Sequence, residues 1–268
     1  MNELNARSPA PARPNRDQSL LKLVAILTMI VDHVGVVFFP SVTLLRVIGR
    51  IAFPLFAWGV AVGAEKTRDW RLYALRLLLM AVVSQPFYML ALSHNLMEFN
   101  VMATLLLGLL AIQGVRLKWY GSQVWGPALC LLLASAFRMD YGWRGVLLIL
   151  LMYFARDSRG GLAALMVAFC LYWGGGSSVF PRVELIQPAD SPFARFNGAV
   201  NEFLGLFKLQ SLAVLALPLM LIDTHSGYRM PKWLGYAAYP GHLLLLWLLD
   251  LALQGRLAYT LLHPEVWF

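Results

Sequence analysis

An aspartate and a histidine, Asp32 and His33, stand side by side inside a long apolar run over residues 20–39. Ionisable side chains are costly in hydrocarbon, so one that lies inside a membrane segment is by default a candidate functional residue. An imidazole titrates near neutral pH and can take a proton from an attacking amine or hydroxyl group. The adjacent carboxylate can orient the imidazole or hold a cation. The pair therefore predicts a catalytic base, His33, with Asp32 as its partner.

Two arginines follow this run. Arg46 and Arg50 are four residues apart, so they share one face of a helix. Their guanidinium groups fit a functional or structural ion pair, for which Asp32 is a candidate partner. Alternatively, both groups lie among lipid headgroups at the membrane surface. The spacing is compatible with both.

A second basic cluster lies in the segment Ala64–Arg71, which contains Arg68, and Arg76 comes shortly after it. Arginine binds phosphate oxygens through two parallel hydrogen bonds, so this cluster can hold an anionic cofactor such as a coenzyme A thioester. Alternatively, the cluster only marks a cytoplasmic loop, because such loops are enriched in Lys and Arg.

Two further places in the chain carry candidate residues. His242 follows closely after Pro240, and a proline inside a helix loosens the helix around it. His242 is then either a hydrogen-bonded structural residue or a second histidine of the site. Asp140 and Tyr141 join two apolar runs and precede a glycine, so they form either a simple turn or an acceptor-binding site.

The composition identifies the class of protein in which these residues act. Hydrophobic residues make up 59% of the chain and charged residues only 13%, whereas about a quarter of a soluble domain is charged. The net charge of +8 comes from basic residues between apolar runs, so membrane topology explains it better than nucleic-acid binding. Cys130 and Cys170 lie inside apolar runs without the spacing of a metal site. We expect contact with the lipid bilayer, and neither a metal nor a nucleic acid.

Apolar runs close to the ~20 residues of one membrane crossing recur along the chain. They predict an all-α, polytopic transmembrane helical bundle with about 9 spans, within a range of roughly 8–10. The predicted spans cover residues 20–39, 47–64, 74–93, 100–115, 124–138, 142–156, 160–174, 203–222 and 235–254.

Loop charge orients this bundle. Lys and Arg are concentrated in the segments that are cytoplasmic if the N-terminus is inside, which predicts a cytoplasmic N-terminus. We expect a disordered cytoplasmic tail over residues 1–19, a long extracytoplasmic loop over 174–201 and a C-terminal tail over 257–268. At a rise of ~1.5 Å per residue, His33 lies about 20 Å and His242 roughly 10 Å from the cytoplasmic start of their spans. The two histidines therefore differ in depth unless helix tilt brings them level.

The polar motifs also occur in a characteristic order. In chain order they are Asp32-His33-Val-Gly35, Leu45-Arg46-Val-Ile-Gly-Arg50-Ile-Ala-Phe-Pro54, Thr67-Arg68, Tyr73-Ala-Leu-Arg76, Ser84-Gln-Pro86-Phe, Asn100 with Thr104, Asp140-Tyr141-Gly142, Gln210, Pro218 and Tyr239-Pro240-Gly241-His242. Together they resemble the TraX family over about residues 20–250, through their joint order rather than any single motif. That family is known for the protein that acetylates the N-terminus of conjugative F-pilin. It is similar to a wider group of transmembrane acyltransferases.

The resemblance implies a multi-pass acetyltransferase of the bacterial inner membrane, with residues 20–256 as its transmembrane acyltransferase domain. Acetyl-CoA would be the cytoplasmic donor. The acceptor would be an amine or hydroxyl group at the outer face, such as a pilin N-terminus or an envelope glycan. The resemblance makes His33 the base or a transient acyl carrier, oriented by Asp32, and His242 a second histidine of the site. It assigns cofactor or ion-pair roles to Arg46, Arg50 and Arg76.

Two other functions fit the same residues. Asp–His pairs and proline-broken helices also serve ion pathways, so a proton-coupled membrane transporter is one alternative. The other is a non-catalytic assembly factor for pili or the envelope, in which the polar residues serve only helix packing.

Overall fold

Helices make up nearly all of the regular structure in the computed structural model of the chain, which describes residues 13–174 and 208–253. The predicted all-α class is confirmed, and the strands within these residues are two short ones, β1 (Glu98–Phe99) and β2 (Arg138–Met139). The predicted tail over 257–268 and the predicted loop over 174–201, except Gly174, lie outside the described residues.

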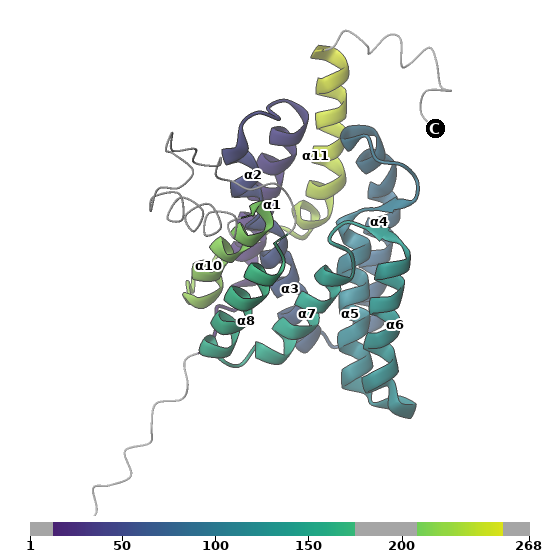
Figure 1. Cartoon of the computed structure of the whole chain (residues 1–268), viewed down its shortest axis with the longest axis vertical. Coiled ribbons are helices and arrows are strands. Elements are labelled where there is room, and N and C mark those ends of the chain that lie inside the picture. Colours follow the sequence, from purple (N-terminus) through teal and green to yellow (C-terminus); the bar gives the residue numbers. More distant parts are fainter. Residues whose placement is uncertain (1–12, 175–207, 254–268) are drawn as a thin grey trace, which may run out of the picture.

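The helices pack side by side, with α4, α5 and α6 together on one flank (Figure 1) and α7 in contact with both α3 and α8. They are α1 (Gln18–Val37), α2 (Thr43–Gly49), α3 (Ala52–Lys66), α4 (Trp70–Leu92), α5 (Val101–Leu117), α6 (Ser122–Ala136), α7 (Gly142–Ala155), α8 (Arg159–Tyr172), α10 (Leu217–Leu221) and α11 (Lys232–Leu253), with the 3-10 helices η1 (Trp119–Gly121) and η2 (Leu209–Ala216).

Four helical stretches of the described chain are long and apolar enough to cross a membrane. Other apolar helices, such as α5, α7 and α8, have only 10–17 residues, which is short of the ~20 that span a bilayer core. The chain is thus a multi-pass membrane protein, while the number of about nine spans stays a prediction. The four long stretches are Gln18–Val37, Thr43–Lys66, Trp70–Leu92 and Trp233–Leu253.

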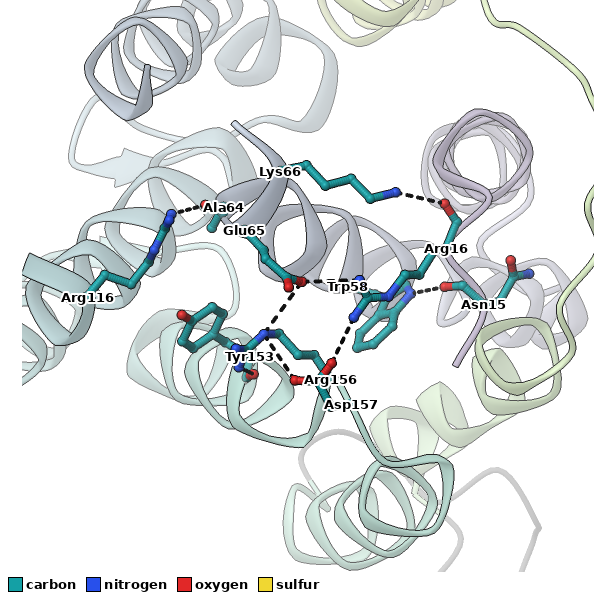
Figure 2. A network of polar contacts seen from close by, with 10 residues as sticks. All are labelled: Asn15, Arg16, Trp58, Ala64, Glu65, Lys66, Arg116, Tyr153, Arg156 and Asp157. Atoms are coloured by element: carbon teal, nitrogen blue, oxygen red, sulfur yellow. Dashed lines mark hydrogen bonds and ion pairs between the residues drawn. The ribbon is translucent and has the colours of Figure 1, made fainter. Parts of the chain in front are cut away.

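The segment that precedes α1 is tied into the bundle. Asn15 is fully buried, and its side-chain amide donates to the backbone carbonyl of Leu219 over 2.9 Å. The indole of Trp58 in α3 donates to the Asn15 carbonyl over 2.8 Å, as Figure 2 shows. The tail predicted over residues 1–19 is therefore wrong for its last part, because these hydrogen bonds hold residues 13–17 and α1 begins at Gln18.

Ion pairs join the ends of several helices beside this segment (Figure 2). Arg16 contacts Glu65 at the end of α3 over 3.4 Å and Asp157, between α7 and α8, over 2.9 Å. Arg156 lies 3.6 Å from each of the same two carboxylates. Its guanidinium also covers the ring of Tyr153 at 4.1 Å. The start of α1 and the ends of α3 and α7 therefore lie together at one end of the bundle.

The short strands position a loop at the opposite end. β1 and β2 pair in parallel, and the backbone N–H of Asp140 donates to the carbonyl of Phe99 over 2.9 Å. The hydroxyl of Thr104 in α5 donates to the carbonyl of Asp140. Asn100, fully buried, bonds to the Ala81 carbonyl of α4 over 2.8 Å and thereby fixes the start of α5. The backbone of the loop that carries Asp140 is thus held from two sides.

The buried Asn15 side chain yields a prediction about stability. Asn15→Ala should destabilise the protein by about 1–3 kcal/mol, because the hydrogen bonds of the buried amide to the Leu219 carbonyl and the Thr224 hydroxyl are lost. The change is measured as a lower melting temperature of the purified protein in detergent. Arg13→Ala serves as the control, because that side chain is exposed. Equal melting temperatures for the two variants would contradict the anchoring role.

Candidate functional site

The centre of the site is a buried carboxylate shared by two guanidinium groups. Arg50 directs one nitrogen, Nη2, at both oxygens of Asp32, over 3.0 Å and 2.9 Å. Arg46 adds a bond from Nη1 to Oδ2 over 3.2 Å. The four-residue spacing places both arginines on the face of α2 and the following turn that meets α1. Of the interpretations left open by the sequence, the structure shows the ion pair with Asp32.

A glycine makes this ion pair sterically possible. A Cβ at Gly49 would lie only 2.1 Å from Oδ1 and 2.3 Å from Cβ of Asp32. Any side chain at this position would therefore push the carboxylate away from the arginines. The glycine between Arg46 and Arg50 thus serves close packing of α1 against α2.

A glutamine distant in the sequence completes the polar cluster. Arg50 Nη1 donates to Oε1 of Gln210 in η2 over 3.0 Å, across 160 residues of chain. Both side chains are largely buried, and Arg50 Nε and Gln210 Nε2 have no hydrogen-bond partner within the described residues. Gln210 was not predicted as a site residue. Its signals in the sequence were a polar side chain in an otherwise apolar stretch and its place in the motif order that resembles the TraX family.

The two membrane histidines are in direct contact. His33 Nδ1 lies 2.7 Å from His242 Nε2, and the rings are almost parallel with their centroids 5.0 Å apart. Of the two outcomes that the sequence left open, the structure therefore shows the histidines level with each other. His33 lies fifteen residues beyond the start of α1 and His242 ten residues beyond the start of α11, so the contact comes from how the two helices tilt and shift against each other and not from where they begin.

The hydrogen bonds define which ring nitrogen carries each proton. His242 Nδ1 lies 2.7 Å from the backbone carbonyl of Ala238, and a carbonyl only accepts, so this nitrogen is protonated. In a neutral ring Nε2 of His242 is then an acceptor, and the proton between the two rings belongs to Nδ1 of His33. It follows that His33 Nε2 has a free lone pair. Within the described residues this nitrogen has no hydrogen-bond partner.

The same histidine borders a small cavity. Asp32, His33, Asp140, Tyr141 and Tyr239 contribute to its lining, and its free space is about 20 Å³. A cavity of this size holds about one water molecule. A larger molecule must therefore displace side chains or separate helices to reach His33. The structure thus brings the predicted acceptor-binding residues Asp140 and Tyr141 to the predicted base.

Aromatic rings form another side of the cavity. The ring of Tyr141 stacks on that of Phe53 with a centroid distance of 3.8 Å. Trp173, at the end of α8, meets the Tyr141 ring edge-on at 5.8 Å. Phe53 and Trp173 are both buried, so Tyr141 packs against rigid neighbours.

Arg68 and Arg76 lie apart from this cluster. Both are exposed, and they follow the end of α3, which lies at the same end of the bundle as Arg16. His33 is fifteen residues beyond the start of α1 at Gln18, which corresponds to about 22 Å along the helix. The predicted cofactor-binding arginines therefore form two separate groups.

The shared carboxylate yields a prediction about the ion pair. Arg50→Ala should destabilise the protein by about 3–5 kcal/mol, because the Asp32 charge stays buried with only Arg46 as counter-ion. Arg50→Lys should restore only part of the lost stability, since an ammonium group has one nitrogen and cannot reproduce the hydrogen bonds of the two terminal guanidinium nitrogens. Melting temperatures in detergent measure the effect.

The matched variant for this test is Arg76→Ala, which removes an exposed arginine. The double variant Asp32→Leu with Arg50→Met removes both buried charges, so it should be more stable than Arg50→Ala. If Arg50→Ala melts at the same temperature as Arg76→Ala, the ion pair contributes nothing to the fold.

Comparisons with known proteins identify the family. Residues 17–250 match the family described as TraX protein. A probable fimbrial assembly protein, FimC of serogroup H1, from Dichelobacter nodosus is 28% identical over 189 residues, which are 63% of this chain and 77% of that protein. An uncharacterised protein of Rickettsia prowazekii is 46% identical over 41 residues, which are 15% of this chain and only 16% of that protein. No solved structure matches the chain. With a match that extends over residues 17–250, this multi-pass membrane protein belongs to the TraX family.

Proposed function

We propose that the protein is an acyltransferase that moves an acetyl group from cytoplasmic acetyl-CoA to an amine or hydroxyl acceptor at the outer face of the membrane. The observation that carries this proposal is the free lone pair of His33 Nε2. It results from the hydrogen bonds between Ala238, His242 and His33. A base at the border of a cavity, within hydrogen-bond reach of a bound acceptor, is what acyl transfer needs.

The proposed reaction is a single displacement at the thioester. The acceptor nitrogen or oxygen attacks the carbonyl carbon while its proton moves to His33 Nε2. The tetrahedral intermediate then expels the thiolate of coenzyme A, which receives that proton from His33. His242 takes no part in bond making, but it holds the His33 ring in the tautomer that has Nε2 free. This arrangement does not require an acyl-histidine.

The ion pair supports this chemistry electrostatically. Two guanidinium groups face one carboxylate in the cluster of Arg46, Arg50 and Asp32, which leaves one excess positive charge close to His33 when Asp140 is protonated. Negative charge develops on the thioester oxygen in the transition state, and a fixed positive charge nearby stabilises it. Because the cluster is buried, this effect is larger than it would be in water.

The exposed arginines suggest where the donor binds. Arg68 and Arg76 lie at the end of the bundle remote from the loop of Asp140, and arginine forks suit phosphate oxygens. We infer that they hold the nucleotide part of acetyl-CoA at the cytoplasmic side of the inner membrane. The pantetheine arm would then extend between the helices toward His33.

The acceptor is proposed from the relatives. The similarity to a probable fimbrial assembly protein favours a pilus-related role, with a pilin N-terminus or an envelope glycan as the acceptor. Asp140, in the loop before α7, is the residue that we infer to contact it, since it borders the cavity beside His33. Burial raises the pKa of the Asp140 carboxyl to about 6. Its charge therefore changes near neutral pH.

The histidine pair yields a direct test. His33→Ala should lower acetyl transfer by at least about 10²-fold, since positioned bases contribute about 10²–10⁴-fold. His242→Ala should also lower it, because His33 loses the partner that fixes its tautomer. Purified protein in liposomes is incubated with radiolabelled acetyl-CoA and host envelope fractions, and the labelled product is measured.

His225→Ala provides the matched control, because His225 is exposed in the loop before α11. Full turnover by a correctly inserted His33→Ala variant would reject the assignment. Counterflow of a solute into the liposomes without any thioester would instead favour a transporter.

The raised pKa of Asp140 yields a prediction about pH. Its ordinary pKa of 3.8 becomes about 6 in the folded protein, so the folded state binds this proton more tightly than the unfolded state. The free energy of unfolding should therefore decrease as the pH rises from about 4 to about 6. Asp140→Asn should remove this decrease. Melting temperatures in detergent across this range compare the two proteins, and parallel curves would show that Asp140 does not titrate there.

A further inference from the structure

Tyr141 has an unusual backbone conformation. It immediately precedes α7 with φ 66° and ψ −11°, in the left-handed region. A bulky residue in this region is uncommon, because its Cβ crowds the backbone. Such conformations persist where the surroundings enforce them, and they are frequent at functional sites. The backbone conformation of Tyr141 therefore makes this residue a candidate for a functional role.

The surroundings fix the ring of Tyr141 from two sides. Phe53 stacks on it with an interplanar angle of 10°, and Trp173 contacts its edge. Phe53 is only 2% exposed, so the stack cannot shift outward without disturbing the core. With the ring held, the position of the hydroxyl group at its tip is defined as well.

The hydroxyl group has no hydrogen-bond partner within the described residues, although Tyr141 borders the same cavity as His33. Burial and the nearby Asp140 raise the pKa of the Tyr141 hydroxyl, and the charge of Arg50 opposes that rise. The group therefore stays protonated at physiological pH and acts as a donor. A donor held at the cavity beside a base is suited to receive a developing negative charge.

We propose that the Tyr141 hydroxyl is the oxyanion donor of the acyl transfer, hydrogen-bonded to the carbonyl oxygen of the thioester. The assignment rests on the proposed function. It differs from the acceptor-binding role that the sequence predicts for Tyr141, because it places the residue on the donor side of the reaction.

The step can be written in full. The acceptor atom forms a bond to the carbonyl carbon, and the π electron pair of the carbonyl moves onto its oxygen. The Tyr141 O–H donates a hydrogen bond to this oxyanion and keeps its own proton. The acceptor proton passes to His33 Nε2. When the carbonyl re-forms, the carbon–sulfur bond breaks and the thiolate takes the proton from His33.

A purely structural role for Tyr141 makes a different prediction, because packing depends on the ring and not on the hydroxyl. Tyr141→Phe retains the stack on Phe53 and removes only the O–H donor. If the hydroxyl binds the oxyanion, this variant should lose about 10²–10³-fold in kcat, the loss typical of one oxyanion donor. Its KM for acetyl-CoA and its melting temperature should stay close to those of the wild type.

The experiment uses the full chain in liposomes with radiolabelled acetyl-CoA and host envelope fractions. The matched control is Tyr153→Phe, which removes a phenol hydroxyl from the other end of the bundle. An unchanged kcat for Tyr141→Phe, together with an inactive His33→Ala variant, would overturn the role of Tyr141 alone. A wild-type protein that transfers no acetyl group would instead refute the proposed function itself.

Discussion

The structure depends on one buried interaction, the carboxylate of Asp32 between the guanidinium groups of Arg46 and Arg50. Separate charges would be too costly inside an apolar bundle, and their mutual attraction offsets much of this cost. The interaction joins α1 to α2 and reaches η2 through Gln210. Asp32 also directly precedes His33, so the same contact that holds three elements together sets the helix rotation that presents the histidine to the cavity.

The candidate site combines elements that each have a structural task of their own. Helix α1 supplies His33, α11 supplies its partner His242, and the loop stabilised by β1 and β2 supplies Asp140 and Tyr141. None of these residues lies on a flexible surface loop, which suits a site that needs fixed geometry. Substrate entry, in contrast, needs movement. The cavity is so small that a thioester can reach His33 only when side chains or helices move.

The sequence predicted local features well and long-range contacts poorly. The run over residues 20–39 corresponds closely to α1 at Gln18–Val37, because length and hydropathy alone define such a helix. The ion pair of Asp32 with Arg46 and Arg50 was one of the interpretations that the sequence left open, and the structure contains it. The sequence named His242 as a second histidine of the site but left open whether it is level with His33, since that depends on how the helices tilt against each other. The link to Gln210 was missed because 160 residues separate it from Arg50.

The anchored segment before α1 has a consequence for biogenesis. The amide of Asn15 finds its acceptor on Leu219, 204 residues later in the chain. A ribosome must therefore complete most of the polypeptide before the earliest described residues can adopt their final positions. Until then the first helix can insert into the bilayer, but the segment before it lacks its hydrogen-bond partner on α10. Packing of the segment before α1 against α10 is consequently a late event of synthesis, although this segment is made first.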